Sequence, residues 1–68
     1  MISETEHRLI ETMLDYGANE ELRHLLCSAL SEEQQESAIS FMKRHYQKYG
    51  EVTEEDILKV LLILTKPF

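Results

Sequence analysis

The chain has 68 residues, a length that allows one domain, which we assign to residues 1–68. Its formal net charge of −6 argues against sequence-independent binding to nucleic-acid phosphates or to an anionic membrane surface. The single cysteine, Cys27, excludes an intramolecular disulfide. Because a core of this size contributes only ~3–5 kcal/mol of net stability, we expect oligomerisation to supply more.

The first residues carry acids and lack a continuous apolar run after a basic start, so they do not resemble a secretory signal. The longest apolar stretch is well short of the ~20 residues that span a bilayer. With one free thiol and no export signal, a reducing cytoplasm is the expected location, and no membrane partner is predicted.

The first predicted helix covers about residues 4–16. Ser3 and Glu6 have the spacing of a capping box, in which each side chain satisfies a backbone donor of the other. Gly17 can adopt the left-handed conformation that ends a helix. The apolar residues between these signals follow the spacing of one helical face: Leu9, Ile10, Met13 and Leu14.

The second predicted helix covers about residues 20–30 and begins after the cap residue Asn19. Its apolar face consists of residues at three- and four-residue spacing: Leu22, Leu25, Leu26, Ala29 and Leu30. Because the link to the first helix is only a few residues long, the two helices should form an antiparallel or sharply angled hairpin.

The third predicted helix covers about residues 32–49, with a capping box from Ser31 to Gln34 and a glycine stop at Gly50. Acids lead this helix and bases close it, as the helix dipole favours. Its stripe of apolar and aromatic residues consists of Ala38, Phe41, Met42, His45, Tyr46 and Tyr49, with Ile39 alongside.

The fourth predicted helix covers about residues 54–66 and begins at the cap residue Thr53. Between Ile57 and Leu64, every residue except Lys59 is a large aliphatic. A helix this apolar needs cover on most of its circumference. We therefore predict an all-α fold, a compact bundle of four short helices in which the C-terminal helix is the most buried.

Neither of two metal-site patterns is convincing. His24 and Cys27 lie three residues apart on one helix, but a structural zinc site usually has two such pairs of closely spaced ligands. A free cysteine is more often a small apolar residue of the core. Residues 45–56 match an EF-hand loop only at Gly50 and Val52, and most positions that bind calcium lack carboxylates. We expect no metal and no cofactor.

Catalysis has no sequence support. No glycine-flanked nucleophile and no glycine-rich phosphate loop is present. Four short helices also leave little room for a deep pocket, and no small-molecule substrate is suggested. We expect a protein that is not an enzyme.

The apolar excess of the last helix is the main functional signal. One apolar face is enough for packing in a bundle. If the other three helices do not cover the second face of Leu58 and Leu62, with Ile63 further round, it forms an exposed patch of the kind that marks interaction sites. The alternative is that this helix is central and wrapped by the other three. Tyr46, Tyr49 and Phe68 are predicted anchors at the rim of that patch. We therefore expect a non-catalytic protein–protein interaction module, a homodimer or the binder of a helical partner.

Two alternatives remain open. Lys43, Arg44 and Lys48, interleaved with tyrosines, are suitable materials for a nucleic-acid-associated regulator, although the next helix lacks the polar surface of a DNA-reading helix. The other alternative is an acidic inhibitor or decoy of a basic partner, since nine of the thirteen acids occupy the opening turns of the four helices. Dipole complementarity already explains those acids, and helices running up and down should divide them between two ends.

Overall fold

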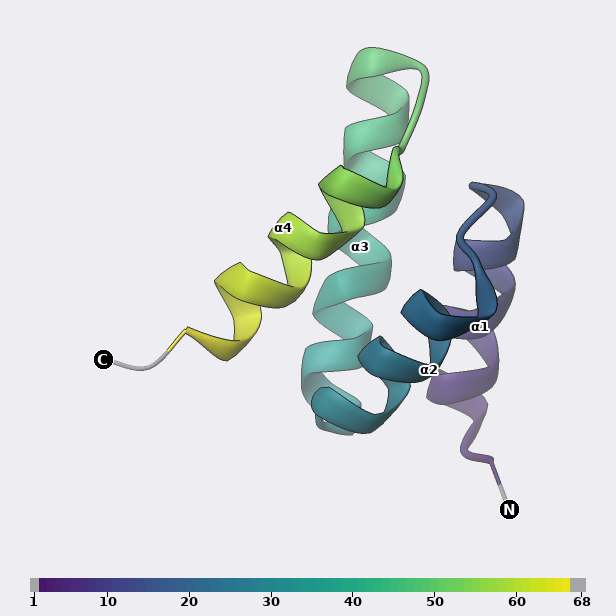
Figure 1. Ribbon diagram of the computed structural model, residues 1–68, viewed down its shortest axis with the longest axis vertical. Helices are drawn as coiled ribbons and strands as arrows, with labels where there is room; N and C mark the ends of the chain where they lie inside the picture. Colours follow the sequence, from purple (N-terminus) through teal and green to yellow (C-terminus); the bar gives the residue numbers. More distant parts are fainter. Residues whose placement is uncertain (1, 67–68) are drawn as a thin grey trace.

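The computed structural model describes residues 2–66, which form four α-helices and no strand (Figure 1). The helices are α1 (Glu4–Asp15), α2 (Glu20–Ala29), α3 (Glu32–Tyr49) and α4 (Glu54–Thr65). The predicted all-α class is confirmed. The bounds of α3 agree with the prediction, and α1, α2 and α4 end one residue earlier than predicted.

Each helix begins directly after the predicted cap residue, whose side-chain oxygen accepts a hydrogen bond from the backbone N–H three residues further on: Ser3, Asn19, Ser31 and Thr53. The capping box of Ser31 and Gln34 is complete, and Thr53 forms a second one with Asp56. At Ser3 only the bond from the Glu6 N–H, 3.1 Å long, is formed.

The turn after α1 is a Schellman motif. Gly17 has a φ of 79°, in the left-handed region, and its N–H donates to the carbonyl of Leu14 over 3.1 Å. The N–H of Ala18 reaches back to the carbonyl of Met13 over 3.0 Å. Met13 and Ala18 are both buried, so this turn enters the core while it redirects the chain into α2.

The long helix α3 joins the two sides of the molecule, because α1 packs mainly against it and α4 also packs on it (Figure 1). The shorter α2 contacts α1 and α4. Buried apolar residues from all four helices and the three links between them form one core: Leu9, Met13, Ala18, Leu22, Leu26, Leu30, Ala38, Ile39, Met42, Val52, Ile57, Val60 and Leu61.

The prediction that the C-terminal helix is the most buried is wrong. Three residues of α4 are buried, Ile57, Val60 and Leu61, whereas α1 buries four. The physical reason is that α4 lies on one side of the molecule, where α2 and α3 cover a single face of it (Figure 1). The outer side chains of α4 therefore remain at the surface.

The stripe of α3 is buried only in part. Ala38, Ile39 and Met42 are buried, while Phe41, Tyr46 and Tyr49 are exposed. Among residues 2–66, no helix combines the length and the apolar character that crossing a membrane requires.

Candidate interaction surfaces

The largest run of exposed aliphatic side chains on one helix belongs to α4. Leu58, Leu62 and Ile63 are 42%, 65% and 59% exposed. Leu58 lines a groove between α2 and α4 together with Leu25 of α2. Ile63 lines a second groove, between α3 and α4, together with Phe41 of α3. We call these five residues the α4 outer surface.

Charged side chains of both signs accompany this surface. Glu55, Lys59 and Lys66 are all exposed, and their spacing on the helix places them between Leu58 on one side and Ile63 on the other. The acid lies in the first turn of α4 and Lys66 lies just past its last turn. The charge therefore changes sign along the helix axis.

Two of the aromatic anchors predicted for the same contact, Tyr46 and Tyr49, lie on α3 beside other rings. Tyr46 stacks on Tyr16, which follows α1, with the ring centroids 5.3 Å apart. Tyr49 lies at the end of α3 with its ring centroid 4.6 Å from that of His45. Phe68 lies outside the described residues. Of the predicted interface residues that the structure describes, Leu58, Leu62 and Ile63 lie exposed on α4.

The predicted basic segment of α3 is exposed but does not form one face. Arg44 and Lys48 are four residues apart and thus neighbours on the helix, whereas Lys43 projects from a different side. The ammonium nitrogen of Lys48 lies 5.3 Å from the ring centroid of Tyr49. This arrangement offers two neighbouring cations rather than a continuous basic stripe.

The acidic helix starts are divided into two groups, as expected for helices of alternating direction. The Thr5 hydroxyl lies 3.3 Å from carboxylate oxygens of both Glu32 and Glu36, so the beginnings of α1 and α3 are adjacent. Glu21 and Glu54 line the same groove, so the beginnings of α2 and α4 form the second group.

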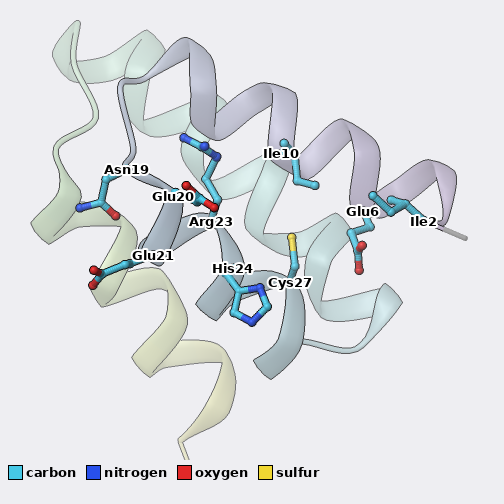
Figure 2. Close-up of a pocket in the computed structure, with 9 residues that line it drawn as sticks. All are labelled: Ile2, Glu6, Ile10, Asn19, Glu20, Glu21, Arg23, His24 and Cys27. Carbon is cyan, nitrogen blue, oxygen red and sulfur yellow. The ribbon is translucent and has the colours of Figure 1, made fainter.

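A second surface feature is an open groove between α1 and α2, with a volume of about 710 Å³ (Figure 2). Ile10 and Cys27 lie between Glu20 at one end and Glu6 at the other. The guanidinium of Arg23 also lines the groove and donates a 2.6 Å hydrogen bond to the carbonyl of Ala18.

Burial raises the pKa of the Cys27 thiol, and the nearby carboxylate of Glu6 raises it further. The thiol is therefore held in its neutral form, which is a poor nucleophile and a poor metal ligand. Within the described part of the chain, no group of three histidine, cysteine or acidic side chains converges as a metal site would require.

In residues 45–56, the segment compared with an EF-hand loop, the Asp56 carboxylate forms hydrogen bonds within the chain. The carboxylate of Asp56 accepts bonds from the N–H and the hydroxyl of Thr53, at 3.0 Å and 2.9 Å. The Nε2 atom of His45 lies 3.2 Å from the same oxygen. These groups fix the start of α4 against the end of α3.

Sequence reasoning missed Leu25, Phe41 and Ile10 as surface residues, because all three fall on apolar helical faces. The apolar spacing marks each of them for burial, and only the packing of the helices shows which remain at a groove.

Comparison with known proteins adds no assignment: no family model, no curated protein and no solved structure matches this chain.

Proposed function

We propose that this chain is a non-catalytic protein–protein interaction module that self-associates through the α4 outer surface. The observation that supports it is the exposure of Leu58, Leu62 and Ile63 on a helix whose opposite face is buried. Removing such side chains from water stabilises association by roughly 25 cal/mol per Å² before the costs of binding. With its free thiol, Cys27, we assign the module to the cytoplasm.

A second copy is the proposed occupant because the charges of α4 complement themselves. When two α4 helices lie antiparallel with Leu58 opposite Ile63 of the other copy, the sequence register also places Glu55 opposite Lys66. The same pairing occurs twice about the two-fold axis of a symmetric dimer. In a parallel pair, by contrast, like charges would face each other.

The size of a standard interface indicates how far this contact must extend. A stable interface buries roughly 800 Å² on each partner, and the whole chain exposes 4922 Å². Three side chains on one helix do not supply that area. The contact must therefore include Leu25 on α2 or Phe41 on α3, at the two edges of the α4 outer surface.

The decisive experiment is the absolute molar mass in solution, measured by light scattering across a dilution series. We expect twice the 8.0 kDa of one chain, about 16 kDa, at low micromolar concentration. Leu62→Glu should reduce this mass to 8.0 kDa and leave the helical circular dichroism unchanged. Leu14→Glu, at a position of similar exposure on α1, is the matched control and should remain dimeric.

The antiparallel arrangement has its own test. Glu55→Lys should weaken the dimer, and the double variant Glu55→Lys with Lys66→Glu should restore it, because both pairs are reversed together. A dimer that loses affinity with the first change and gains nothing with the second has another arrangement. A wild-type chain that remains monomeric at 8.0 kDa removes the proposal altogether.

Two other functions have less support. A nucleic-acid-associated regulator would use Arg44 and Lys48, the neighbouring cations of α3, and Lys43 on another side of the same helix. Salt-dependent binding that is lost when these three residues become alanine would favour it. An inhibitor or decoy role would need the acids of all four helix starts on one surface, whereas they form two groups.

A further inference from the structure

We propose that the groove between α1 and α2 binds an amphipathic helix of a partner protein whose basic side chains flank an apolar centre. One end of this site adjoins the groove between α2 and α4, because Asn19, Glu21 and His24 line both. The rest of the site is distinct: Ile2, Glu6, Ile10 and Cys27 line neither groove beside α4.

The centre of the groove is apolar. Ile10 and Cys27 lie on facing sides of it, on α1 and α2, and both are half-buried (Figure 2). Ile2, which precedes α1, lies at the end of the groove beside Glu6 and is 56% exposed. These three side chains gain from further burial, and nothing in the described chain covers them.

The ends of the groove are acidic. Glu20 and Glu21 lie at one end and Glu6 at the other, so the groove is lined by three carboxylates and one guanidinium, that of Arg23 at the Glu20 end (Figure 2). Arg23 is already hydrogen-bonded to the carbonyl of Ala18. The excess of negative charge selects a cationic occupant and disfavours an acidic one.

The spacing of these groups sets the pattern of the partner. Glu20 and Cys27 are separated by about 10 Å along α2, two helical turns. Glu6 raises the pKa of Cys27, so its carboxylate lies near that end of the groove. A helix with lysine or arginine at positions i and i+7 and leucine between them, at i+3 and i+4, fits both ends and the centre.

The proposed test uses three synthetic peptides of about 15 residues. The probe peptide carries lysines and leucines in the pattern above. The second peptide has glutamate in place of each lysine, and the third is a scrambled sequence of the same composition as the probe. Binding to the ¹⁵N-labelled full chain is measured by NMR titration, which locates the affected amides.

We expect the probe peptide to bind with shifts concentrated at residues 2–10 and 20–27, and the other two peptides to bind at least about tenfold more weakly. Glu6→Gln combined with Glu20→Gln should weaken the probe about three- to tenfold, as expected for two partly solvated ion pairs. Glu51→Gln, an exposed loop position outside the groove, is the control and should change nothing.

Ile2→Ser supplies a variant that leaves all four helices untouched, because Ile2 lies before the cap of α1. It should also weaken the probe, through loss of apolar contact. The inference is overturned if the probe does not bind, if the glutamate or scrambled peptide binds equally well, or if the shifts fall on α3 and α4. Equal binding by the Glu6/Glu20 double variant also overturns it.

Discussion

The imidazole Nε2 of His45 lies 3.2 Å from the carboxylate of Asp56, and this contact joins the last turns of α3 to the first turn of α4. The same carboxylate closes the capping box of α4 through the backbone N–H of Thr53. Asp56 thus has two roles, one within its own helix and one between helices, and both depend on its negative charge.

Because Asp56 carries these bonds as a carboxylate, the stability of the fold should depend on pH through it. The backbone hydrogen bond from Thr53 lowers the pKa of Asp56 below its ordinary value of 3.8, and the Thr53 hydroxyl, His45 and Lys59 lower it further. A lowered folded-state pKa stabilises the fold above the ordinary value, and this contribution is lost as pH falls through the folded-state value.

We therefore expect Asp56→Asn to flatten the fall of the melting temperature below about pH 3.8, compared with wild type. Glu51→Gln, which changes an exposed carboxylate in the adjacent loop, is the matched control. Melting curves recorded between pH 2 and pH 7 test this, in steps of roughly half a unit. Parallel pH profiles for wild type and Asp56→Asn would contradict the assigned role.

The side-chain amide of Gln35 on α3 donates hydrogen bonds to backbone carbonyls at the C-terminal end of α2. Its amide nitrogen lies 3.2 Å from the carbonyl oxygens of both Cys27 and Leu30, while its own Oε1 is buried without a partner. Gln35→Met removes the donor and should destabilise the fold by about 1–3 kcal/mol. Gln35→Glu should cost more at pH 7, because a carboxylate only accepts hydrogen bonds and would face two carbonyl oxygens.

Urea denaturation at pH 7 and at pH 5 separates the effects at Gln35. The loss of unfolding free energy in Gln35→Glu should be smaller at pH 5 than at pH 7. Burial favours the neutral form of the new carboxyl group, so the native state binds a proton there as the pH falls. Gln47→Met, at an exposed position on the same helix, should be nearly neutral. Equal losses for Met and Glu at both pH values would refute this account.

Leu61 is one of three α4 residues in the core, with 8% of its surface exposed. Leu61→Ala should destabilise the fold by ~2–5 kcal/mol through lost burial and a residual cavity. Leu14→Ala, at a half-exposed position on α1, should cost less than about 1 kcal/mol. Thermal unfolding followed by circular dichroism compares the two, and an unchanged melting curve for Leu61→Ala would show that α4 is not docked.

The thiol of Cys27 should react slowly with alkylating reagents, because burial and the Glu6 carboxylate both raise its pKa and deplete the thiolate. Glu6→Gln should increase the rate of reaction with iodoacetamide at pH 8. Since burial is the larger cause, the rate should stay below that of a free thiol. Glu11→Gln is the control, and equal rates for it and Glu6→Gln would place Glu6 away from the groove.

The helix bounds could be predicted because they are set locally. Ser3, Asn19, Ser31 and Thr53 each satisfy a backbone donor within their own turn, and Gly17 adopts a conformation that few other residues tolerate. These preferences are independent of the tertiary packing. The class and the order of elements follow from them.

The burial of α4 could not be predicted, because it depends on how many neighbours reach that helix. The apolar spacing places Ile57, Val60 and Leu61 on one face, and those residues are buried. It does not show whether another helix covers Leu62. Gln35 was missed for a similar reason: its partners are carbonyls at the end of α2, which only the folded chain brings to α3.

The stacked pair of Tyr16 and Tyr46 gives this protein an intrinsic optical signal. The chain contains three tyrosines and no tryptophan, so its ultraviolet fluorescence arises from few sites. Two of the three rings lie with their centroids 5.3 Å apart, one just after α1 and the other on α3. Separation of α1 from α3 will part these rings and change the tyrosine emission. The association of these helices during folding can therefore be followed without a label.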